Sequence, residues 1–238
     1  MSLHVIILAA GKGSRMKSDT PKVLHPVAGT PMLHRVMSTA KRLAPEQMHV
    51  VLGHGIEAIQ DTLANQWSAT NIVQQAQQLG TGHAVNIALE HLPNDGISLV
   101  LYGDVPLITA DTLERCVAIA DAGELGIVTA NMSDPAQLGR ILRNDTDSIE
   151  AIVEYKDATQ QQRGIHEINS GILAAPTHLL RHWLTQVQPN NQQGEYYLTD
   201  VVALAVNDGV GVQGIVVDDE NEVMGVNDRV QLSQVERI

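Results

Sequence analysis

Three cations and two glycines lie close together near the start of the chain. The segment Leu8-Ala9-Ala10-Gly11-Lys12-Gly13-Ser14-Arg15-Met16 is followed by Lys22, within Pro-Lys-Val-Leu. Glycines let backbone N–H groups approach an anion closely, and successive N–H groups form a nest for phosphate oxygens. Arg can grip a phosphate through two parallel hydrogen bonds, whereas Lys acts as a mobile point charge. Because the whole chain has a formal net charge of −12, this local excess of cations predicts a polyphosphate site.

This loop matches neither of two common phosphate-binding motifs. The Walker A motif, G-x-x-x-x-G-K-[ST], does not occur, and the dinucleotide fingerprint G-x-G-x-x-G would need a glycine at Met16. A plain tight turn is the structural alternative for the Gly-x-Gly pair. For Arg15 and Lys22, each taken alone, the alternative is a solvated surface position.

Asp104 is a candidate ligand for a divalent metal ion. It follows the apolar run Ile97–Tyr102, so it should lie at the carboxyl edge of a sheet, where ligands bind in parallel α/β folds. A carboxylate suits Mg²⁺, which keeps several waters and takes one or two protein ligands plus phosphate. The structural alternative is a turn residue or helix-start cap before Pro106.

The sequence gives no sign of a covalent mechanism or a histidine-bound zinc. Cys116 lies in the largely apolar run Leu113–Ala120, which is typical of a buried structural thiol, and no Gly-x-Ser-x-Gly elbow occurs. His178 and His182 have a spacing that can bind zinc, but the glutamate of His-Glu-x-x-His and a third ligand are missing. We therefore expect surface or capping histidines there, and no catalytic role for His83.

Short apolar runs alternate with helical stretches in the first half of the chain. This β-α-β-α order is typical of a parallel sheet covered by helices on both faces, and it predicts a Rossmann-like α/β fold. We expect strands at Val5–Ala10, His49–Leu52, Asn71–Val73, Ile97–Tyr102 and Gly126–Ala130, and helices at Pro31–Leu43, Ile56–Leu63, Gly82–Leu92 and Thr109–Ala120, the last capped by Thr109.

After about residue 135 the pattern becomes mixed. We find no internal repeat and no linker, and expect one domain over residues 1–238, with a nucleotide-binding half at about 1–135 and a mixed half at about 136–238. The turns at Gly11–Gly13 and at Gly103-Asp104 should meet at one rim of the sheet. In the second half we expect strands at Arg140–Leu142, Ile149–Val153, Ile165–Ala174 and Val210–Val217, interrupted by the polar segment Lys156–Arg163, and helices at Leu179–Val187, Leu198–Val206 and Val226–Val235.

Composition excludes several classes of protein. With 238 residues, 44% of them hydrophobic, the chain can bury roughly 70–75% of its unfolded surface without staples. An excess of 27 acidic over 15 basic residues argues against broad nucleic-acid binding. One cysteine forms no internal disulfide, which fits a reducing cytoplasm. No signal peptide and no apolar run of about 20 residues is present, so we expect neither export nor a membrane span.

Several motifs together resemble one enzyme family over about residues 4–237. The glycine-rich loop and Pro21-Lys22-Val23-Leu24 look like the signature of sugar-nucleotide pyrophosphorylases. The wider set resembles the uridyltransferase domain of the bacterial bifunctional enzymes that make UDP-N-acetylglucosamine. The further motifs are Gln75-Ala76-Gln77-Gln78-Leu79-Gly80-Thr81-Gly82-His83-Ala84, Tyr102-Gly103-Asp104-Val105-Pro106-Leu107, Gly139-Arg140, Ile152-Val153-Glu154, Lys156-Asp157-Ala158, Glu167-Ile168-Asn169-Ser170-Gly171-Ile172, Gly194-Glu195-Tyr196-Tyr197-Leu198-Thr199-Asp200 and Gly225-Val226-Asn227-Asp228-Arg229.

The resemblance implies a nucleotide-diphospho-sugar transferase fold and a defined reaction. UTP and N-acetylglucosamine 1-phosphate would give UDP-N-acetylglucosamine and pyrophosphate, with Mg²⁺ as cofactor, for cell-wall and lipopolysaccharide precursors. The sugar phosphate would attack the α-phosphorus directly. No protein nucleophile is needed, since a phosphate monoester is largely a dianion near pH 7, so catalysis would rest on positioning and charge neutralisation.

The resemblance also assigns residues to the two substrates and the metal. Lys22 would steady the α-phosphate, Arg15 would hold the departing phosphates, and Asp104 with Asn227 would bind the metal. Gln75, Gly80, Thr81 and the backbone of Ala10 would recognise uracil, the amide both donating and accepting. The nucleotide set is Leu8, Ala9, Ala10, Gly11, Lys12, Gly13, Arg15, Lys22, Gln75, Gly80 and Thr81, and the sugar set is Tyr102, Gly103, Asp104, Gly139, Glu154, Asn169, Thr199 and Asn227.

The sequence departs from the family at two points. Leu138 stands where tyrosine is frequent, which alters one wall of the sugar pocket, and Ser14 replaces the usual threonine. Full-length family members continue into a left-handed β-helix that forms a trimer and acts as an acetyltransferase. The sequence ends where that part would begin, so we expect a monomer or weak dimer that does not bind acetyl-CoA.

Two alternatives stay open from the sequence. One is a nucleotidyltransferase of the same fold that uses another base or another sugar phosphate. The other is a sugar-nucleotide-binding module without catalysis. The presence of Lys22, Asp104 and Asn227 together favours an enzyme, because binding alone does not need all three.

Overall fold

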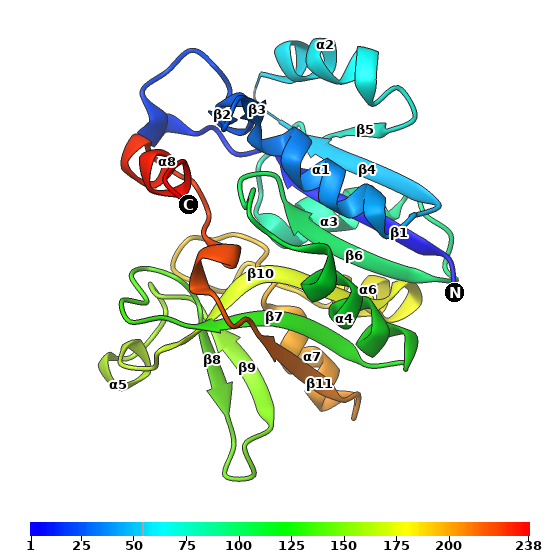
Figure 1. Cartoon of the computed structure of the whole chain (residues 1–238). Helices are drawn as coiled ribbons and strands as arrows, with labels where there is room; N and C mark the ends of the chain where they lie inside the picture. Colours follow the sequence, from blue (N-terminus) through cyan, green and yellow to red (C-terminus); the bar gives the residue numbers. More distant parts are fainter. Residues whose placement is uncertain (54) are drawn as a thin grey trace.

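One mixed sheet forms the centre of the molecule (Figure 1). The computed structural model describes residues 1–53 and 55–238, without the side chain of Asn65, and within them this sheet has nine strands. Along its main path the order is β11 (Val212–Val216), β7 (Leu125–Asn131), β10 (Glu167–Pro176), β6 (Ile97–Tyr102), β1 (Leu3–Ala9), β4 (Gln47–Leu52) and β5 (Asn71–Gln74), and a hairpin of β8 (Arg140–Arg143) and β9 (Ile149–Val153) joins it at β10.

The sheet is mostly parallel, as the sequence predicts. β1 pairs in parallel with β4 and β6, β4 with β5, and β7 with β11, whereas β10 runs antiparallel between β6 and β7. Val5, Ile6 and Ile7 of β1 have no exposed surface. Such a strand is apolar on both faces because helices cover both sides of the sheet.

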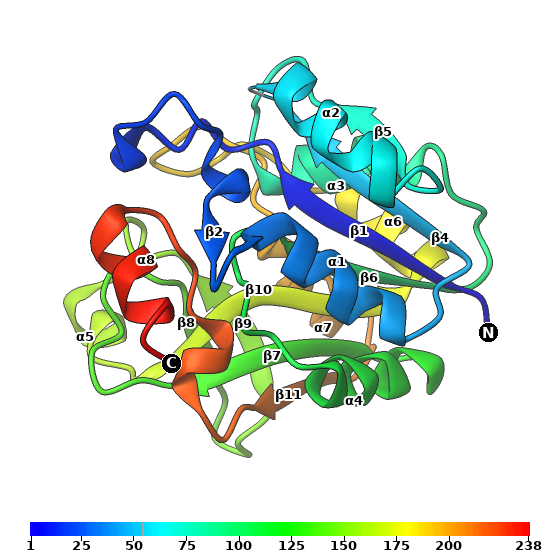
Figure 2. The same cartoon turned by 45° about the horizontal axis from the view of Figure 1, so that its top comes forward.

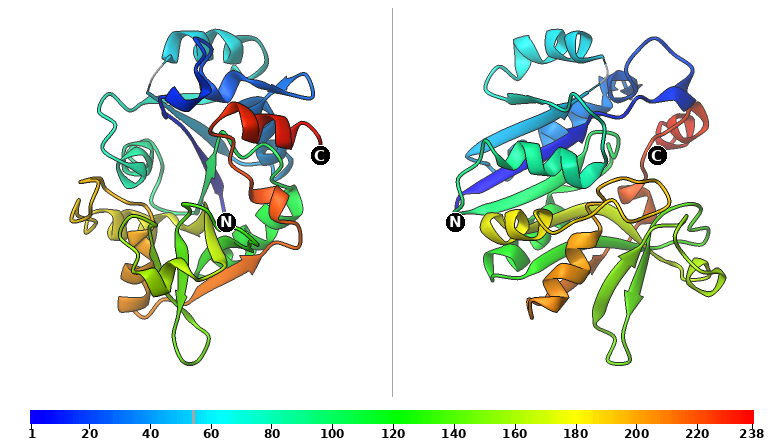
Figure 3. Two further views of the ribbon diagram at one scale, coloured as in Figure 1. Left: turned by 90° about the vertical axis from the view of Figure 1, so that its left-hand side faces the viewer. Right: turned by 180° about the vertical axis from the view of Figure 1, so that it is seen from behind.

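Helices cover the two faces in separate groups (Figures 1 and 3). Val5 and Ile7 pack with one group, and Ile6 and Leu8 with the other, because successive side chains of a strand point to opposite faces. The first group is α1 (Met32–Arg42), α2 (Ile56–Gln66) and α4 (Ala110–Asp121), and the second is α3 (Thr81–Leu89), α6 (Thr177–Leu184) and α7 (Asp200–Asn207).

The predicted elements occur in the structure, with small shifts at their ends. The bounds of β6 and β9 are those expected, and Thr109 caps α4 by accepting a hydrogen bond from the Thr112 N–H at 3.3 Å. The last helix, α8 (Arg229–Val235), begins three residues later than expected. Asp228 explains this start, since its carboxylate accepts from the N–H groups of Val230 and Gln231.

Short elements escape the sequence prediction. The polar segment Lys156–Arg163 contains a one-turn helix, α5 (Gln160–Arg163), which begins with a capping box of Thr159 and Gln162. The others are two 3₁₀ turns, η1 (Ser14–Met16) and η2 (Lys22–Leu24), the β2 (Pro26–Val27) and β3 (Thr30–Pro31) hairpin, and a third 3₁₀ turn, η3 (Glu220–Val223). They are too short to show a hydrophobic period.

Two side-chain expectations can be checked at this level. Cys116 is fully buried and its thiol donates to the Gly126 carbonyl at 3.4 Å, and burial raises the pKa of that thiol to about 12. It is therefore a structural residue, as expected. No helix in the described residues is both long and apolar enough to cross a membrane.

Candidate active site

A cavity of about 420 Å³ opens at the carboxyl ends of β1 and β6. These strands are parallel neighbours, so the turns that follow them, at Gly11 and Asp104, meet at one rim, on the left of Figure 1. Ligands bind at this edge in α/β folds. The residues singled out from the sequence that line the cavity are Leu8, Ala9, Ala10, Gly11, Lys22, Gln75, Gly80, Thr81, Tyr102, Asp104, Asn169 and Asn227.

Lys22 stands at the centre of the polar end of the cavity. Its ammonium group donates to the carboxylate of Asp104 and, at 3.0 Å, to the amide oxygen of Asn227. The side chains of Lys22 and Asp104 are only 12% and 15% exposed. Three residues that are up to 205 positions apart in the chain thus bring one ammonium group and two oxygen atoms that could bind a metal ion to a single point.

The glycine-rich loop packs closely against Lys22 and so helps to position it. Gly13 has a φ of +59°, and a Cβ added there would lie 2.6 Å from the Cβ of Lys22. Only a residue without a side chain allows this approach. Lys12 and Arg15 are exposed on the same loop and do not line the cavity.

The segment Gly225–Arg229 delivers Asn227 to the site from the far end of the chain (Figure 2). The Val226 N–H donates to the Asp104 carbonyl at 2.9 Å, and the Asn227 N–H donates to Gln231 Oε1 at 2.7 Å. Arg229 donates to the carbonyls of Met16 and Lys17, at 2.9 and 3.1 Å. This segment therefore fastens the turn after β6 to the loop after β1.

Gln75 lies at the other end of the cavity, directly after β5. It is 4% exposed, and its amide nitrogen donates to the Gly80 carbonyl at 3.1 Å and to Nδ1 of His83 at 3.0 Å. Both amide protons are thus engaged, so the amide presents an acceptor but no free donor, unlike the donor-and-acceptor role expected from sequence. Gln78 also reaches the cavity and donates to the Ala10 carbonyl at 2.6 Å.

An irregularity in β10 shapes the side of the cavity nearest β6. The pairing with β7 shifts register between Asn169 and Leu173, and Gly171 adopts a φ of +88°. A Cβ on Gly171 would lie 2.5 Å from the ring of Tyr102, so this glycine makes room for the tyrosine. The bulge turns Asn169 and Ser170 toward the cavity.

Glu154, Gly139 and Thr199 form a separate group beside the cavity. The Thr199 hydroxyl donates to Glu154 Oε1 at 3.3 Å, and a Cβ on Gly139 would lie 3.4 Å from the same oxygen. Burial, followed by the charges of Asp157 and Asp200, raises the pKa of the Glu154 carboxyl. Gly103 does not line the cavity either. Its N–H donates to the Leu8 carbonyl at 2.9 Å and joins the end of β6 to β1.

Sequence reasoning missed several residues at the site. Leu138 is not one of these, because the family resemblance already places it at one wall of the sugar pocket; it is 39% exposed and lines the cavity. Ser170 and Glu195 also line it, and both lie inside motifs that were quoted for other residues. His83 was given no role, although its ring contacts Gln75.

The fold and the site define a nucleotidyltransferase domain. Residues 5–190 match the model of the MobA-like NTP transferase domain, and the chain belongs to this family. Two solved structures share the fold along nearly their whole length. One is a UDP-glucose pyrophosphorylase complexed with UDP-glucose (TM-score 0.79, 15% identity, covering 100% of this chain and 98% of that one). The other is a putative glucose-1-phosphate thymidylyltransferase from Bacillus anthracis in complex with sucrose (TM-score 0.77, 18% identity, covering 99% and 94%).

The chain has a much higher sequence identity to a narrower group of relatives. It is 53% identical over 237 residues to the bifunctional protein GlmU of Pseudomonas aeruginosa strain LESB58, covering 100% of this chain and 52% of the relative. It is 52% identical over 235 residues to the bifunctional protein GlmU of Marinobacter nauticus, covering 99% and 51%. The chain thus spans about half the length of these relatives.

Proposed function

We propose that this domain is an N-acetylglucosamine-1-phosphate uridyltransferase, which makes UDP-N-acetylglucosamine and pyrophosphate from UTP and the sugar phosphate. The observation that carries the proposal is the meeting of Lys22, Asp104 and Asn227 at the polar end of a ligand-sized cavity. The similarity to GlmU proteins over the whole chain supports the choice of substrates.

Asp104 and Asn227 fit a divalent metal ion. A carboxylate oxygen and an amide oxygen already converge on one positive charge, that of Lys22, and such hard oxygen donors suit Mg²⁺. These two residues would hold the ion, and the remaining ligands would be water and phosphate. When bound, the ion would neutralise negative charge on the phosphates.

The chain's own residues would position two anions for an in-line transfer. An oxygen of the sugar phosphate forms a bond to the α-phosphorus of UTP, and the bond from that phosphorus to the bridging oxygen breaks, so that pyrophosphate leaves with the electron pair. Lys22 lies where it can neutralise the α-phosphate, and the loop with Arg15 and Lys12 would hold the β- and γ-phosphates. This transfer needs no protein nucleophile.

The apolar end of the cavity would hold the base. Leu8, Ala9 and Ala10 offer one wall, and Gln75 offers an amide oxygen that can accept from N3–H of uracil. The N–H groups of Gly80, which precedes α3, and of Thr81, its first residue, lack intrahelical acceptors and would donate to a base carbonyl.

The second half of the chain would bind the sugar, with Tyr102 and Gly103 of the first half beside it. Asn169 and Tyr102 line the cavity next to the metal ligands, and the pair of Glu154 and Thr199 can accept and donate hydrogen bonds to hydroxyls. Gly139 places no side chain beside Glu154, where the sugar would approach. We accordingly assign nucleotide binding to about residues 1–135 and sugar binding to about 136–238, in the cytoplasm, where UTP is made.

Pyrophosphate release tests the proposal directly. Purified protein with Mg²⁺ is given each of four nucleoside triphosphates with N-acetylglucosamine 1-phosphate or glucose 1-phosphate. We expect release with UTP and the N-acetylated sugar only. Release with another pairing would overturn the base or sugar assignment, and no release in any pairing would favour a binding module.

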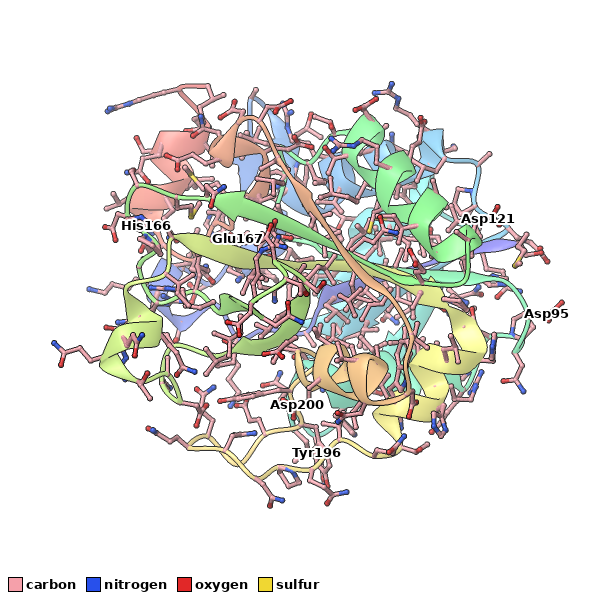
Figure 4. The ribbon with its side chains drawn as sticks, turned by 90° about the horizontal axis from the view of Figure 1, so that it is seen from below. Asp95, Asp121, His166, Glu167, Tyr196 and Asp200 are labelled. Atoms are coloured by element: carbon pink, nitrogen blue, oxygen red, sulfur yellow. The ribbon has the colours of Figure 1, made fainter. Side chains whose placement is uncertain are left out.

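A variant pair tests the metal ligands in the same assay. Asp104→Ala and Asn227→Ala should each raise the Mg²⁺ concentration needed for half-maximal rate by about tenfold or more, because each removes one oxygen ligand. Asp95→Ala is the control, since Asp95 is an exposed carboxylate at the opposite end of β6 (Figure 4). An unchanged Mg²⁺ requirement in both site variants would refute their role as ligands.

A further inference from the structure

His83 contacts the residue that faces the base. It is the third residue of α3, and its Nδ1 lies 3.0 Å from the amide nitrogen of Gln75. Within the described residues this is the only side-chain hydrogen bond of the ring. The other side of His83 borders a second cavity of about 380 Å³, lined also by Asn86 and Tyr196.

The surroundings of Gln75 determine how its amide is turned. The Gly80 carbonyl, 3.1 Å away, can only accept a hydrogen bond, so the amide nitrogen must face it rather than the oxygen. The second proton of that nitrogen points to His83. Nδ1 must therefore be the unprotonated nitrogen of the ring, with the proton on Nε2.

This arrangement leaves one atom of Gln75 for a ligand. Oε1 accepts no hydrogen bond from the described part of the chain, and Gln75 lines the cavity. An acceptor at that point matches N3–H of uracil and opposes the lone pair on N3 of cytosine. We propose that His83 is a positioning residue that holds the Gln75 amide with Oε1 toward the base and so selects uracil over cytosine; this rests on the proposed function.

The backbone around His83 keeps its ring in place. The Tyr196 N–H donates to the Leu79 carbonyl, and the Gly82 N–H donates to the Tyr196 carbonyl, both at 2.8 Å. Gly80 has a φ of +117°, and a Cβ there would lie 2.5 Å from the Tyr196 carbonyl oxygen. The start of α3 is thus clamped against the segment before α7, labelled by Tyr196 in Figure 4.

A set of three variants of the whole chain tests this role. His83→Ala removes the acceptor with little risk to the helix, since alanine has the highest helix propensity. His83→Asn restores an acceptor, because Asn Oδ1 is as many bonds from the backbone as His Nδ1. His178→Ala, on exposed α6 surface, is the control for loss of a histidine from a helix.

The readouts are kcat and KM for UTP and for CTP, with a thermal melt of each variant. We expect His83→Ala to raise KM for UTP about fivefold, with kcat within about twofold, and to lower the UTP-over-CTP ratio of kcat/KM about fivefold, as for one lost hydrogen bond. His83→Asn should recover most of the ratio, and His178→Ala should keep it. If His83→Ala does not fold, His83→Leu is measured in the same way.

The outcomes separate this inference from the function on which it rests. A wild-type protein that does not prefer UTP would overturn the proposed function. A wild-type preference for UTP that His83→Ala leaves unchanged would overturn the role of His83 alone. In a Gln75→Leu background the His83→Ala change should have no further effect on the ratio, because His83 acts through Gln75. Additive effects would indicate a structural role instead.

Discussion

Lys22 is the residue on which the polar end of the site depends. Asp104 follows β6 in the middle of the chain and Asn227 lies near its end, and an oxygen of each contacts the ammonium group of Lys22. A buried carboxylate without a cation is costly, so the contact with Lys22 offsets the cost of burying Asp104 and holds its side chain in place before substrates arrive. Its charge is then available for the phosphate on which the transfer takes place.

Lys22→Ala should therefore lose turnover more than affinity. We expect kcat to fall by about 10²- to 10³-fold, as when one transition-state donor is removed, with a smaller change in KM for UTP. Steady-state kinetics at saturating Mg²⁺ measures both. Arg42→Ala is the control, because it removes an exposed cation at the end of α1. A kcat that stays within about threefold would contradict a catalytic role for Lys22.

Single residues differ in how far the sequence predicts them. Asp104 can be placed at the sheet rim from the strand that precedes it, whereas Gln75 and Asn227 are recognisable only through family motifs. His83 and Gln78 act through contacts with Gln75 and with the Ala10 carbonyl, across a loop, and no spacing rule reveals such contacts. The two engaged protons of Gln75 are likewise visible only in three dimensions.

At the scale of elements, loops and strand irregularities position the site more than the regular elements do. The spacing of apolar residues predicts the main strands and helices, and the order of these elements predicts which strand ends meet at one rim of the sheet. The 3₁₀ turn that begins at Lys22 and the bulge around Gly171 do not follow from it, although they aim Lys22 and Asn169. Their causes are tertiary contacts, such as the Tyr102 ring against Gly171.

Gly13→Ala tests whether the loop seats Lys22. The new methyl group would meet Lys22 Cβ at 2.6 Å, and a displacement of about 1 Å at a reacting group can cost about 10²-fold in rate. Gly29→Ala is a matched control: Gly29 has a φ of +79° with nothing within 4 Å of an added Cβ. Both variants should lose about 1–2 kcal/mol of stability from backbone strain, measured by urea unfolding. Only Gly13→Ala should lose kcat, and equal rates would contradict this coupling.

At the scale of the whole molecule, β4 holds a buried histidine between β1 and β5 of the sheet. His49 is 2% exposed, and burial, followed by the neighbouring His91 and His4, lowers its pKa to about 4. The unfolded chain takes up a proton at this residue near pH 6.5, and the folded chain does so only near pH 4. Proton binding in this interval therefore favours the unfolded state.

The free energy of unfolding should fall as the pH drops from about 6.5 to about 4 and then level off. The contribution of His49 is on the order of 3 kcal/mol, from the difference between its two pKa values. Urea unfolding at several pH values should show a flatter profile for His49→Gln than for the wild type. His178→Gln, at an exposed position, should keep the wild-type profile. Parallel profiles for His49→Gln and the wild type would contradict the assignment.

The segment Gly225–Arg229 has a consequence for synthesis of the protein on the ribosome. A nascent chain acquires Lys22 early, yet it must grow by 205 more residues before Asn227 exists to meet it. The contacts of Val226 with Asp104 and of Arg229 with Met16 and Lys17 form at the same late moment. An incomplete chain can therefore build most of its sheet without a finished catalytic centre. Translation that stops before Asn227 would release a protein that lacks one of the two proposed metal ligands.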